Sequence, residues 1–386
     1  MTRARLTAAA LALAAASVAS AGDTIKIGVV APFSGPFAEY GRQMDVGMRA
    51  YLKVHGDTVA GKKIQILLKD TTGPVPEVAK RLAQELVVRE EVDFLAGFGL
   101  TPEALAVADV ATQAKKPMIV MNAASSVVTT KSPYIVRVSM TLPQITAPVA
   151  TWAAKNGIKS VVTIVSDYAP GIDSENAFKK AFTAAGGTIV ESIRAPLRNP
   201  EFAPFIQRIK DARPQAVFVF VPAGEQGIAF MKGVQERGLP QAGIKVIATG
   251  DITDDHVLDA MGDVALGMIT SFHYSAAHES PENKAFLAAC AQAGVEGRPN
   301  FMTVAGYDGM AAIFEVVRKL DGKIDADRAV AALRGLRLTS PRGPIAIDPE
   351  TRDIVQTVYL RKVEKRDGHY YNVEFDKVAD VKDPGK

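Results

Sequence analysis

The sequence is short of the reactive and charged groups that many protein functions require. Its 386 residues include one cysteine, Cys290, so no disulfide can form within the chain. There are 45 Lys and Arg against 42 Asp and Glu, and residues 1–21 hold Arg3 and Arg5 but no acid, so without them the formal charge falls from +3 to +1. Nucleic acids and anionic membranes bind chains with clustered Lys and Arg. We therefore expect no nucleic-acid partner, and we expect Cys290 to be a buried structural thiol rather than a nucleophile.

Catalytic and membrane-spanning signatures are also missing. No stretch after the first residues approaches the roughly 20 apolar residues of a membrane-spanning helix. The motifs G-x-S-x-G, G-x-x-x-x-G-K-[ST] and H-E-x-x-H do not occur. Gly97-Phe98-Gly99 is a dinucleotide-binding fingerprint without its third glycine, and of the five histidines only His273 and His278 are near neighbours. The sequence therefore predicts no enzyme activity, no cofactor and no metal site.

The first 21 residues have the three parts of a secretory signal. Arg3 and Arg5 form a positive region, residues 6–18 are a short apolar segment, and Ala19-Ser20-Ala21 is an A-x-A cleavage site. No cysteine lies at the cut, so no lipid anchor is expected. A terminal membrane anchor is the alternative, but the apolar segment is short and ends in small residues. We expect residues 1–21 to be removed and the mature protein to be exported and soluble.

Short β-rich runs alternate with longer helical patterns for most of the length, which is typical of βαβ units around parallel sheets. The run VFVFV at 217–221 suits a strand covered on both faces. The length and the 48% hydrophobic content predict two domains. The predicted strands are 25–31, 63–69, 93–96, 117–121, 160–166, 188–194, 216–221, 245–248 and 267–271. The predicted helices are 38–55, 76–90, 102–115, 142–156, 172–185, 202–212, 224–237, 253–261, 281–294, 302–319 and 326–334.

The pattern changes after the last of these helices. The chain then reads as strands and turns, with Pro349 and Gly368 marking reversals. Two α/β lobes closed by late strands would account for this change. The polar tail 378–386 is expected to fray.

Parallel sheets bind ligands beyond the carboxyl ends of their strands, so the residues that follow each strand are the candidates for a site. Thr101 and the segment 122–126, NAASS, offer hydroxyl groups and backbone N–H groups near helix starts. Free N–H donors and the helix dipole both favour negative charge there, so these residues suit a small carboxylate. Ordinary helix capping is the alternative, because Ser, Thr and Asn are common caps. The other candidate segments are 32–40, 97–101, 167–171, 222–225 and 249–251.

Several longer segments together resemble a known family, the type I periplasmic solute-binding proteins, in particular the leucine/isoleucine/valine-binding branch that serves ABC importers. The resemblance runs from Thr24 to about Tyr359 and is carried by IKIGVVAPFSGPFAEYG, ILLKD, PMIVMNAASS and GPIAID. It implies two doubly wound, Rossmann-like α/β lobes joined by a three-strand hinge, with the ligand in the cleft between them. The implied division is 1–21 as signal peptide, 22–140 with 273–349 as lobe I, and 141–272 with 350–386 as lobe II. The chain would cross between the lobes near Met140, Phe272 and Pro349.

The resemblance also assigns binding roles by position. It implies that Thr101 and Ser125 hold the ligand carboxylate by their hydroxyl groups, that Ala123 does so by its backbone, and that Tyr40 lies beside the ligand side chain. Asp251 aligns roughly with the acid that meets an α-ammonium, although it could equally cap a helix that begins at Thr253.

The second lobe departs from the amino-acid-binding pattern. The family has a tyrosine after the strand 160–166, where this chain is one residue shorter and has Asp167-Tyr168, and a second tyrosine where this chain has Pro222-Ala223. A disulfide found in some relatives is absent. The loss of these polar contacts favours a flat apolar acid over an amino acid. The aromatic residues expected near the cleft are Tyr40, Phe98, Tyr168, Tyr274 and Phe301, although each of them could also be a core residue.

The segments HYSAAHESPENKAF and RPNFMTVAGYDGM look like a subgroup of this branch that takes up benzoate-like acids. The expected function is therefore that of the periplasmic substrate-binding component of an ABC importer, which closes on a benzoate- or cinnamate-like acid and presents it to a membrane permease. The protein is expected to be monomeric. Binding of a branched-chain or other hydrophobic amino acid is the first alternative, a ligand-sensing subunit of a signalling system the second, and a secreted α/β enzyme the third.

Overall fold

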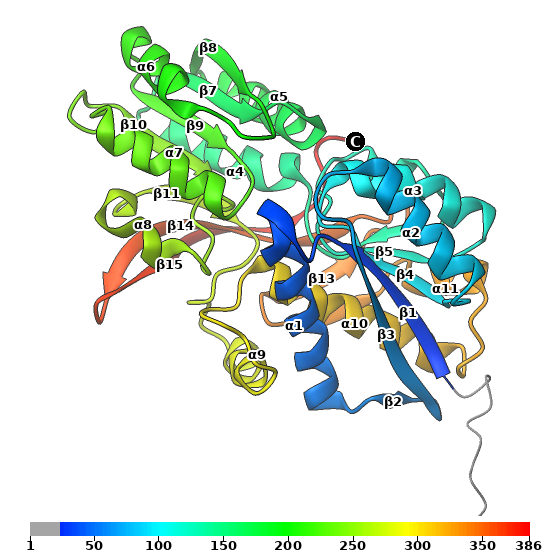
Figure 1. Ribbon diagram of the computed structural model, residues 1–386. Coiled ribbons are helices and arrows are strands. Elements are labelled where there is room, and N and C mark those ends of the chain that lie inside the picture. Colours follow the sequence, from blue (N-terminus) through cyan, green and yellow to red (C-terminus); the bar gives the residue numbers. More distant parts are fainter. Residues whose placement is uncertain (1–23) are drawn as a thin grey trace, which may run out of the picture.

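Two sheets frame the protein, one in each of two lobes that lie side by side (Figure 1). The computed structural model describes residues 24–386, so the predicted signal peptide lies outside the described residues. We call the part around the six-stranded sheet the first lobe and the part around the nine-stranded sheet the second lobe. The first sheet has the order β2-β3-β1-β4-β5-β6, and the second has the order β12-β13-β14-β11-β10-β9-β7-β8, with β15 paired to β14.

The first sheet is covered by helices on both faces, as its uninterrupted apolar strands require. Val30 and Leu95 pack with α2 and α3, whereas Ile27 and Ile119 on the opposite face pack in the core that includes α1 and α10. Its strands are β1 (Thr24–Ala31), β2 (Thr58–Val59), β3 (Lys62–Asp70), β4 (Phe94–Gly97), β5 (Met118–Val120) and β6 (Ile135–Arg137). The helices beside it are η1 (Gly35–Phe37), α1 (Ala38–His55), α2 (Pro76–Val88), α3 (Thr101–Gln113), η2 (Val128–Thr130), α9 (Pro281–Gln292), α10 (Phe301–Lys319) and α11 (Ala326–Leu333).

The second sheet is layered in the same way. Phe218 packs with Phe178 of α5 on one face, with the ring centroids 4.1 Å apart, and Val217 and Val219 pack with α6 and α7 on the other. Its strands are β7 (Ser160–Ser166), β8 (Thr188–Ala195), β9 (Ala216–Phe220), β10 (Lys245–Thr249), β11 (Ile269–Phe272), β12 (Arg337–Ser340), β13 (Gly343–Ile347), β14 (Ile354–Arg366) and β15 (His369–Val381). Its helices are α4 (Leu142–Lys155), α5 (Ala169–Ala184), α6 (Phe202–Ala212), α7 (Glu225–Glu236), α8 (Leu258–Met261) and η3 (Gly262–Ala265).

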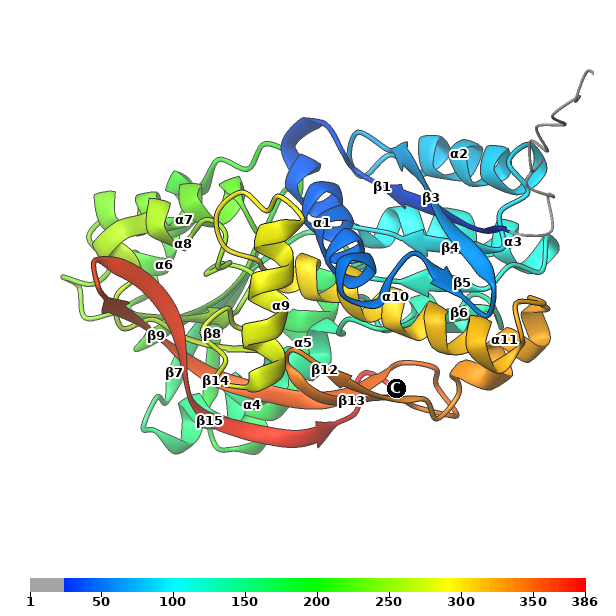
Figure 2. The same cartoon turned by 90° about the horizontal axis from the view of Figure 1, so that it is seen from below.

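The long β14–β15 hairpin runs from the second lobe toward the first (Figures 1 and 2). On its way it contacts α4, where the single tryptophan Trp152 packs edge-on against Phe375 with ring centroids 6.0 Å apart. The strands β12 and β13 extend the same sheet through antiparallel pairing. The exact lobe boundaries at 140, 272 and 349 stay a prediction.

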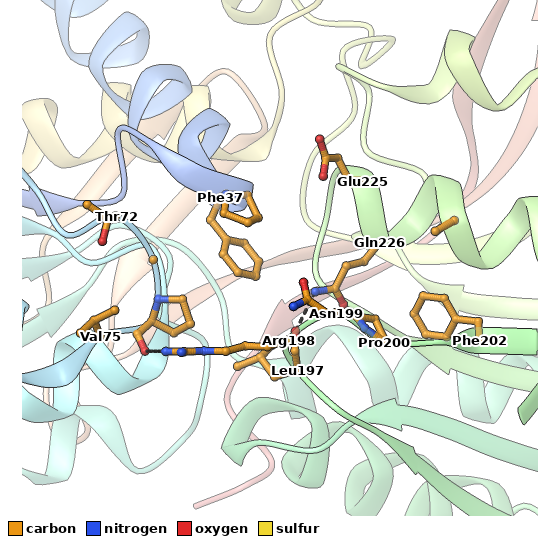
Figure 3. Close-up of a pocket in the computed structure, with 14 residues that line it drawn as sticks. Phe37, Thr72, Val75, Leu197, Arg198, Asn199, Pro200, Phe202, Glu225 and Gln226 are labelled. Carbon is orange, nitrogen blue, oxygen red and sulfur yellow. Dashed lines mark hydrogen bonds between the residues drawn. The ribbon is translucent and has the colours of Figure 1, made fainter.

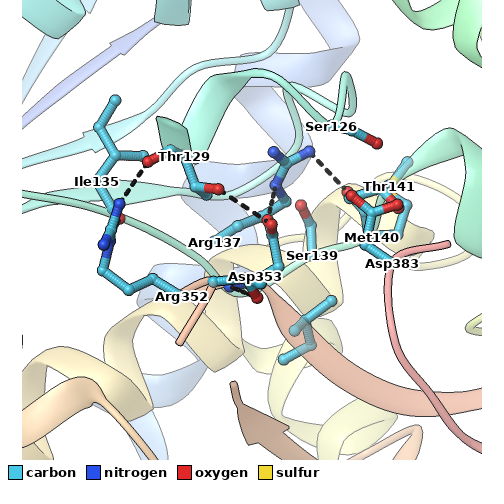
Figure 4. Close-up of polar contacts among 12 residues, drawn as sticks. Ser126, Thr129, Ile135, Arg137, Ser139, Met140, Thr141, Arg352, Asp353 and Asp383 are labelled. Atoms are coloured by element: carbon cyan, nitrogen blue, oxygen red, sulfur yellow. Dashed lines mark hydrogen bonds and ion pairs between the residues drawn. The ribbon is translucent and has the colours of Figure 1, made fainter. Parts of the chain in front are cut away.

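A buried ion pair joins the first sheet to the turn before β14. Arg137, the last residue of β6, is fully buried, and its Nε lies 2.9 Å from Oδ1 of Asp353 (Figure 4). Thr129 of η2 donates to the other oxygen of Asp353 at 3.0 Å. Arg352 reaches back to the first lobe and donates to the carbonyl of Ile135 at 3.0 Å. A buried charge needs such partners, so this cluster fixes the position at which the chain passes between the lobes.

Most predicted elements are confirmed, two predictions are wrong, and two short strands were not predicted. The structure has α8 only at Leu258–Met261, so the helix predicted over 253–261 forms only over its last four residues. The tail predicted to fray is ordered, because β15 continues to Val381 and Lys386 forms an ion pair with Asp353. The strands β2 and β6 were not predicted, because their two and three residues lack the length that marks a strand. None of the helices in residues 24–386 has the length and apolar character of a membrane span.

The helices α1 and α10 cross at unusually close range. A Cβ on Gly47 would lie 1.9 Å from the carbonyl oxygen of Thr303, and one on Gly306 would lie 2.2 Å from that of Met44. Both atoms belong to the facing backbone, so neither can move aside. Only glycine at both positions allows this contact. Gly309, one turn further along α10, differs because a Cβ there would meet the flexible end of Met121 at 2.3 Å.

We expect Gly306→Ala to destabilise the protein by about 2–3 kcal/mol or more, in the upper range for overpacking, despite the better helix propensity of Ala. The matched change Gly309→Ala should cost clearly less, because the Met121 side chain can change rotamer. The midpoints of thermal unfolding of the two variants measure this difference. Equal midpoints would show that the helices can separate without cost.

Candidate functional site

A small cavity of about 10 Å³ lies between the two lobes. This is the room of about one water molecule, so the lobes must move apart for a larger ligand to enter. The described residues that line it from the first lobe are Tyr40, Gly99, Leu100, Thr101, Asn122 and Ala124. Those that line it from the crossing and the second lobe are Met140, Leu142, Tyr168, Pro170, Phe220, Pro222 and Asp251.

A strained turn aims the start of α3 at the cavity. Gly97 and Phe98 both have positive φ, 99° and 65°, and Phe98 is a residue type that rarely adopts this conformation. The turn is held by the Phe98 N–H, which donates to the carbonyl of Val30 at 2.7 Å. Thr101 is consequently the first residue of α3, is 1% exposed and lines the cavity. The positive end of a helix dipole therefore faces the ligand space.

The Thr101 hydroxyl is oriented by the neighbouring loop. Its Oγ1 accepts from the backbone N–H of Ser125 at 3.3 Å, so its own proton is free to be donated elsewhere. Beside it, Asn122 donates from Nδ2 to the carbonyl of Gly99 at 2.6 Å. These contacts join the ends of β4 and β5 and present hydroxyl and amide groups to the cavity.

Glu103 supports this turn from beneath. The side chain is fully buried and accepts from the Leu100 N–H at 2.9 Å and from the Thr71 hydroxyl. Burial raises the pKa of Glu103 to about 8, against the lowering effect of the bonds from Thr71 and from the backbone of Leu100 and Gly99. Desolvation therefore outweighs hydrogen bonding at this carboxyl group.

The second lobe contributes aromatic walls and one acid. Tyr168 stacks on Phe220 with ring centroids 6.2 Å apart. The backbone N–H of Ala223 forms a hydrogen bond with the hydroxyl of Tyr40, which comes from α1 of the first lobe. Asp251 is 5% exposed and accepts from the Thr249 hydroxyl at 2.7 Å. Burial raises the pKa of Asp251 to about 7, and the nearby negative charge of Asp254 adds to the effect. The cavity thus has a hydroxyl and a helix start on one side and an acid on the other.

The lobes also touch outside the cavity. Asp173 of α5 accepts from the Ser125 hydroxyl at 2.6 Å and from the Ser126 N–H at 3.1 Å. Arg198 donates to the carbonyl of Pro74 at 2.8 Å, across a larger hollow of about 400 Å³ that is open to solvent (Figure 3). In this hollow the polar side chains do not converge on one point, so we place the ligand in the smaller cavity.

The structure brings four of the predicted site residues to the cavity wall: Tyr40, Thr101, Tyr168 and Asp251. Ser125 lies beside Thr101, but its hydroxyl donates to Asp173. Ala123 donates its N–H to Phe98 at 2.9 Å and accepts from Arg137 at 2.9 Å, so both of its backbone groups are already bonded.

The other four predicted site residues are core residues that do not line this cavity: Phe98, Ala223, Tyr274 and Phe301. Tyr274 donates its hydroxyl to Asn283, and Phe301 packs edge-on against Phe272. The ligand contacts of all the predicted residues stay a prediction.

Nine of the lining residues were not predicted individually. Six of them lie in the candidate segments that follow predicted strands: Gly99, Leu100, Asn122, Ala124, Pro170 and Pro222. Met140 and Leu142 belong to the crossing between the lobes, and Phe220 was assigned to the strand itself.

Cys290 is buried, as expected, and burial raises its pKa to about 12. Such a thiol is not an activated nucleophile. Residues 24–386 contain no group of three or more His, Cys, Asp or Glu side chains that could hold a metal ion.

Comparison with known proteins places this geometry in a family. The family described as "Periplasmic binding protein" matches residues 24–368. The chain belongs to this family. It is therefore a binding protein rather than an enzyme, and the expected two-lobed α/β fold is confirmed.

Individual relatives cover nearly the whole chain. A solute-binding protein of an ABC transporter from Rhodopseudomonas palustris BisB5, solved with 3,4-dihydroxybenzoic acid, is 57% identical over 94% of this chain and 99% of its own, with a TM-score of 0.91. A second R. palustris solute-binding protein, solved with 4-hydroxybenzoate, is 45% identical with the same coverage and a TM-score of 0.92. The Leu/Ile/Val-binding protein homolog 6 of Brucella melitensis is 47% identical over 100% of this chain and 99% of its own.

The buried Glu103 predicts a pH dependence of stability. An acid whose pKa is higher in the folded protein stabilises it fully below about pH 4.5, and this contribution is lost as the pH rises toward 8. Glu103→Gln removes the ionisable group and keeps an oxygen that can accept from the Leu100 N–H. We therefore expect its thermal midpoint to fall less than that of the wild type between pH 5 and 8.

The exposed Glu77 supplies the matched control, because it also lies on the first turn of a helix. Glu77→Gln should follow the wild-type pH profile. Parallel profiles for wild type and Glu103→Gln would mean that Glu103 is ionised in the folded protein throughout this range.

Proposed function

We propose that the protein is the solute-binding component of an ABC importer and that it captures an aromatic carboxylate between its two lobes. The observation that carries this proposal is the composition of the cavity. Thr101 at the start of α3 suits a carboxylate, since a hydroxyl group and the helix dipole both favour negative charge. Tyr40, Tyr168 and Phe220 supply apolar ring surfaces, against which an aromatic ring gains about 0.5–1.5 kcal/mol per pair beyond area burial.

The known ligands of two relatives support the same ligand class. The two R. palustris proteins described above were solved with hydroxylated benzoic acids.

This role implies export to the periplasm and a membrane permease as the partner. We propose that residues 1–21 are removed as a signal peptide, that the mature monomer works in the periplasm, and that its ligand-bound form is recognised by a membrane permease. Closure of the lobes around the ligand is the usual motion of such proteins.

A hydrophobic amino acid is the second candidate ligand. Asp251 favours it, because a buried ammonium group requires a carboxylate partner and this acid lines the cavity. The relatedness to Leu/Ile/Val-binding homologues agrees with this candidate. Against it, Pro222 and Ala223 provide no side-chain hydrogen bonds to a charged amine.

Calorimetry should show tighter binding of a benzoate-type acid than of leucine, isoleucine or valine. Thr101→Ala should weaken binding of the acid by about 1.5–3 kcal/mol, the range for a hydrogen bond to a charged group. Thr112→Ala is the matched control, because Thr112 lies near the other end of α3 and donates to the carbonyl of Ala108. Binding of leucine alone would reverse the choice of ligand, and an unaffected Thr101→Ala variant would remove this hydroxyl from the carboxylate site.

The bonds from Ser125 and Ser126 to Asp173 join the two lobes without touching the cavity. Asp173→Ala should therefore lower the affinity for every ligand by one common factor, about five- to thirtyfold for one or two lost hydrogen bonds. The control is Asn176→Ala, on the exposed face of α5. A loss confined to some ligands would instead indicate that Asp173 contacts the ligand.

A further inference from the structure

The cavity offers more hydrogen-bond acceptors than a simple aromatic acid can use. A carboxylate only accepts hydrogen bonds, and the Thr101 hydroxyl can donate one to it. Asp251 is the single charged side chain among the described lining residues, and it is an acceptor when ionised. Asn122 also presents an acceptor. A benzoate ring would leave the Asn122 oxygen buried without a donor, which costs about 1–3 kcal/mol, and would leave Asp251 with no donor from the ligand.

Asn122 is the clearer of the two acceptors. The carbonyl of Gly99 can only accept, so the atom 2.6 Å from it must be the amide nitrogen Nδ2, which fixes the orientation of the side chain. The oxygen Oδ1 is then left buried, with no hydrogen-bond partner among residues 24–386. Asn122 is 7% exposed and lines the cavity. Because Asn122 lines the cavity, a donor group of a bound ligand can supply the partner that this oxygen lacks.

Asp251 faces the same space from the second lobe. Thr249 uses one lone pair of Oδ2, so the carboxylate keeps acceptor sites for another donor. Arg361 does not line the cavity, and its guanidinium already donates to the carbonyl of Tyr274 and to the hydroxyl groups of Thr253 and Thr270. The positive charge of Arg361 lowers the pKa of Asp251, but burial has the larger effect, so the pKa is raised. The phenols of Tyr40 and Tyr168 are close enough for Asp251 to raise their pKa values further.

The charges at the two ends fix the direction in which an acid would lie. The start of α3 attracts a carboxylate at the Thr101 side. Asp251, with Asp254 and Asp255 close by, repels a carboxylate at the other side. The part of the ring opposite the acid group would therefore meet Asp251.

We propose that Asp251 and Asn122 accept hydrogen bonds from ring hydroxyl groups of the ligand, so that the protein selects hydroxylated aromatic carboxylates over unsubstituted ones. This inference rests on the proposed function, since it names the class of acid that the same cavity takes. A site built to bind a hydroxyl group discriminates strongly against the analogue that lacks it, because its own polar groups are then left unpaired.

Calorimetry with benzoate, 4-hydroxybenzoate and 3,4-dihydroxybenzoate tests this proposal. For the wild type, we expect at least one hydroxylated acid to bind at least tenfold more tightly than benzoate. Asp251→Ala and Asn122→Ala should each reduce that affinity ratio severalfold. A general loss of folding or positioning would weaken all three acids alike and leave the ratio unchanged. Asp251→Asn, which keeps the size and one acceptor oxygen, should give an intermediate ratio.

Asp109→Asn is the matched control. It makes the same change of side chain, but Asp109 is exposed on α3 and does not line the cavity. Its affinity ratio should equal that of the wild type. Equal binding of benzoate and the hydroxylated acids would overturn the proposed hydroxyl contacts and leave the proposed function standing. If none of the acids binds and leucine does so in an Asp251-dependent manner, the proposed function fails as well, and Asp251 is an ammonium partner.

Discussion

The buried charge of Arg137 is the constraint on which the site depends. Besides its ion pair with Asp353, its guanidinium donates to the carbonyls of Ala123, Ser125 and Met140, at 2.9, 2.8 and 3.3 Å. A guanidinium group has five donors and no acceptor, so it can be buried only where several oxygens converge. The loop that carries Asn122 and the crossing that carries Met140 are thus fixed by one side chain. The loop's hydroxyl and N–H groups are left to bind Thr101, Asp173 and the cavity.

Buried arginines that donate to backbone carbonyls also lie at the other places where the chain passes between the lobes. Arg342 is buried between Asp308 of α10 and the carbonyls of Val138 and Ser139. Arg361 donates to the carbonyl of Tyr274, just beyond β11. Each passage is therefore held by hydrogen bonds to the backbone rather than by apolar contact alone. Breaking such bonds costs more than rotating the backbone between them, so we expect lobe movement to occur by torsion at these passages with the arginines still in place.

The sequence was sufficient for most of the elements and for four of the residues that line the cavity. The boundaries of α1 and α6 and of β7 were predicted to the residue, because apolar periodicity, Pro and Gly mark them clearly. Thr101 and Asp251 could be placed because they follow predicted strands, and parallel strands bring their carboxyl ends to one edge. The rest depends on contacts between distant segments. No local pattern indicates that Ser125 donates to Asp173, or that a hydrogen bond to the carbonyl of Gly99 orients the Asn122 amide. Phe98, Tyr274 and Phe301 were predicted to line the site but are core residues. The sequence does not distinguish an aromatic ring buried in the core from one that lines a cavity.

The position of Trp152 decides which optical signal can follow ligand binding. This single tryptophan lies between α4 and the β15 strand and is not among the residues that line the cavity. Its fluorescence should respond to disruption of the β14–β15 hairpin, and so to unfolding of the second lobe, more than to an occupied site. The cavity itself contains two tyrosines and Phe220. A tryptophan introduced as Phe220→Trp would place an emitting ring against the ligand and make binding directly visible.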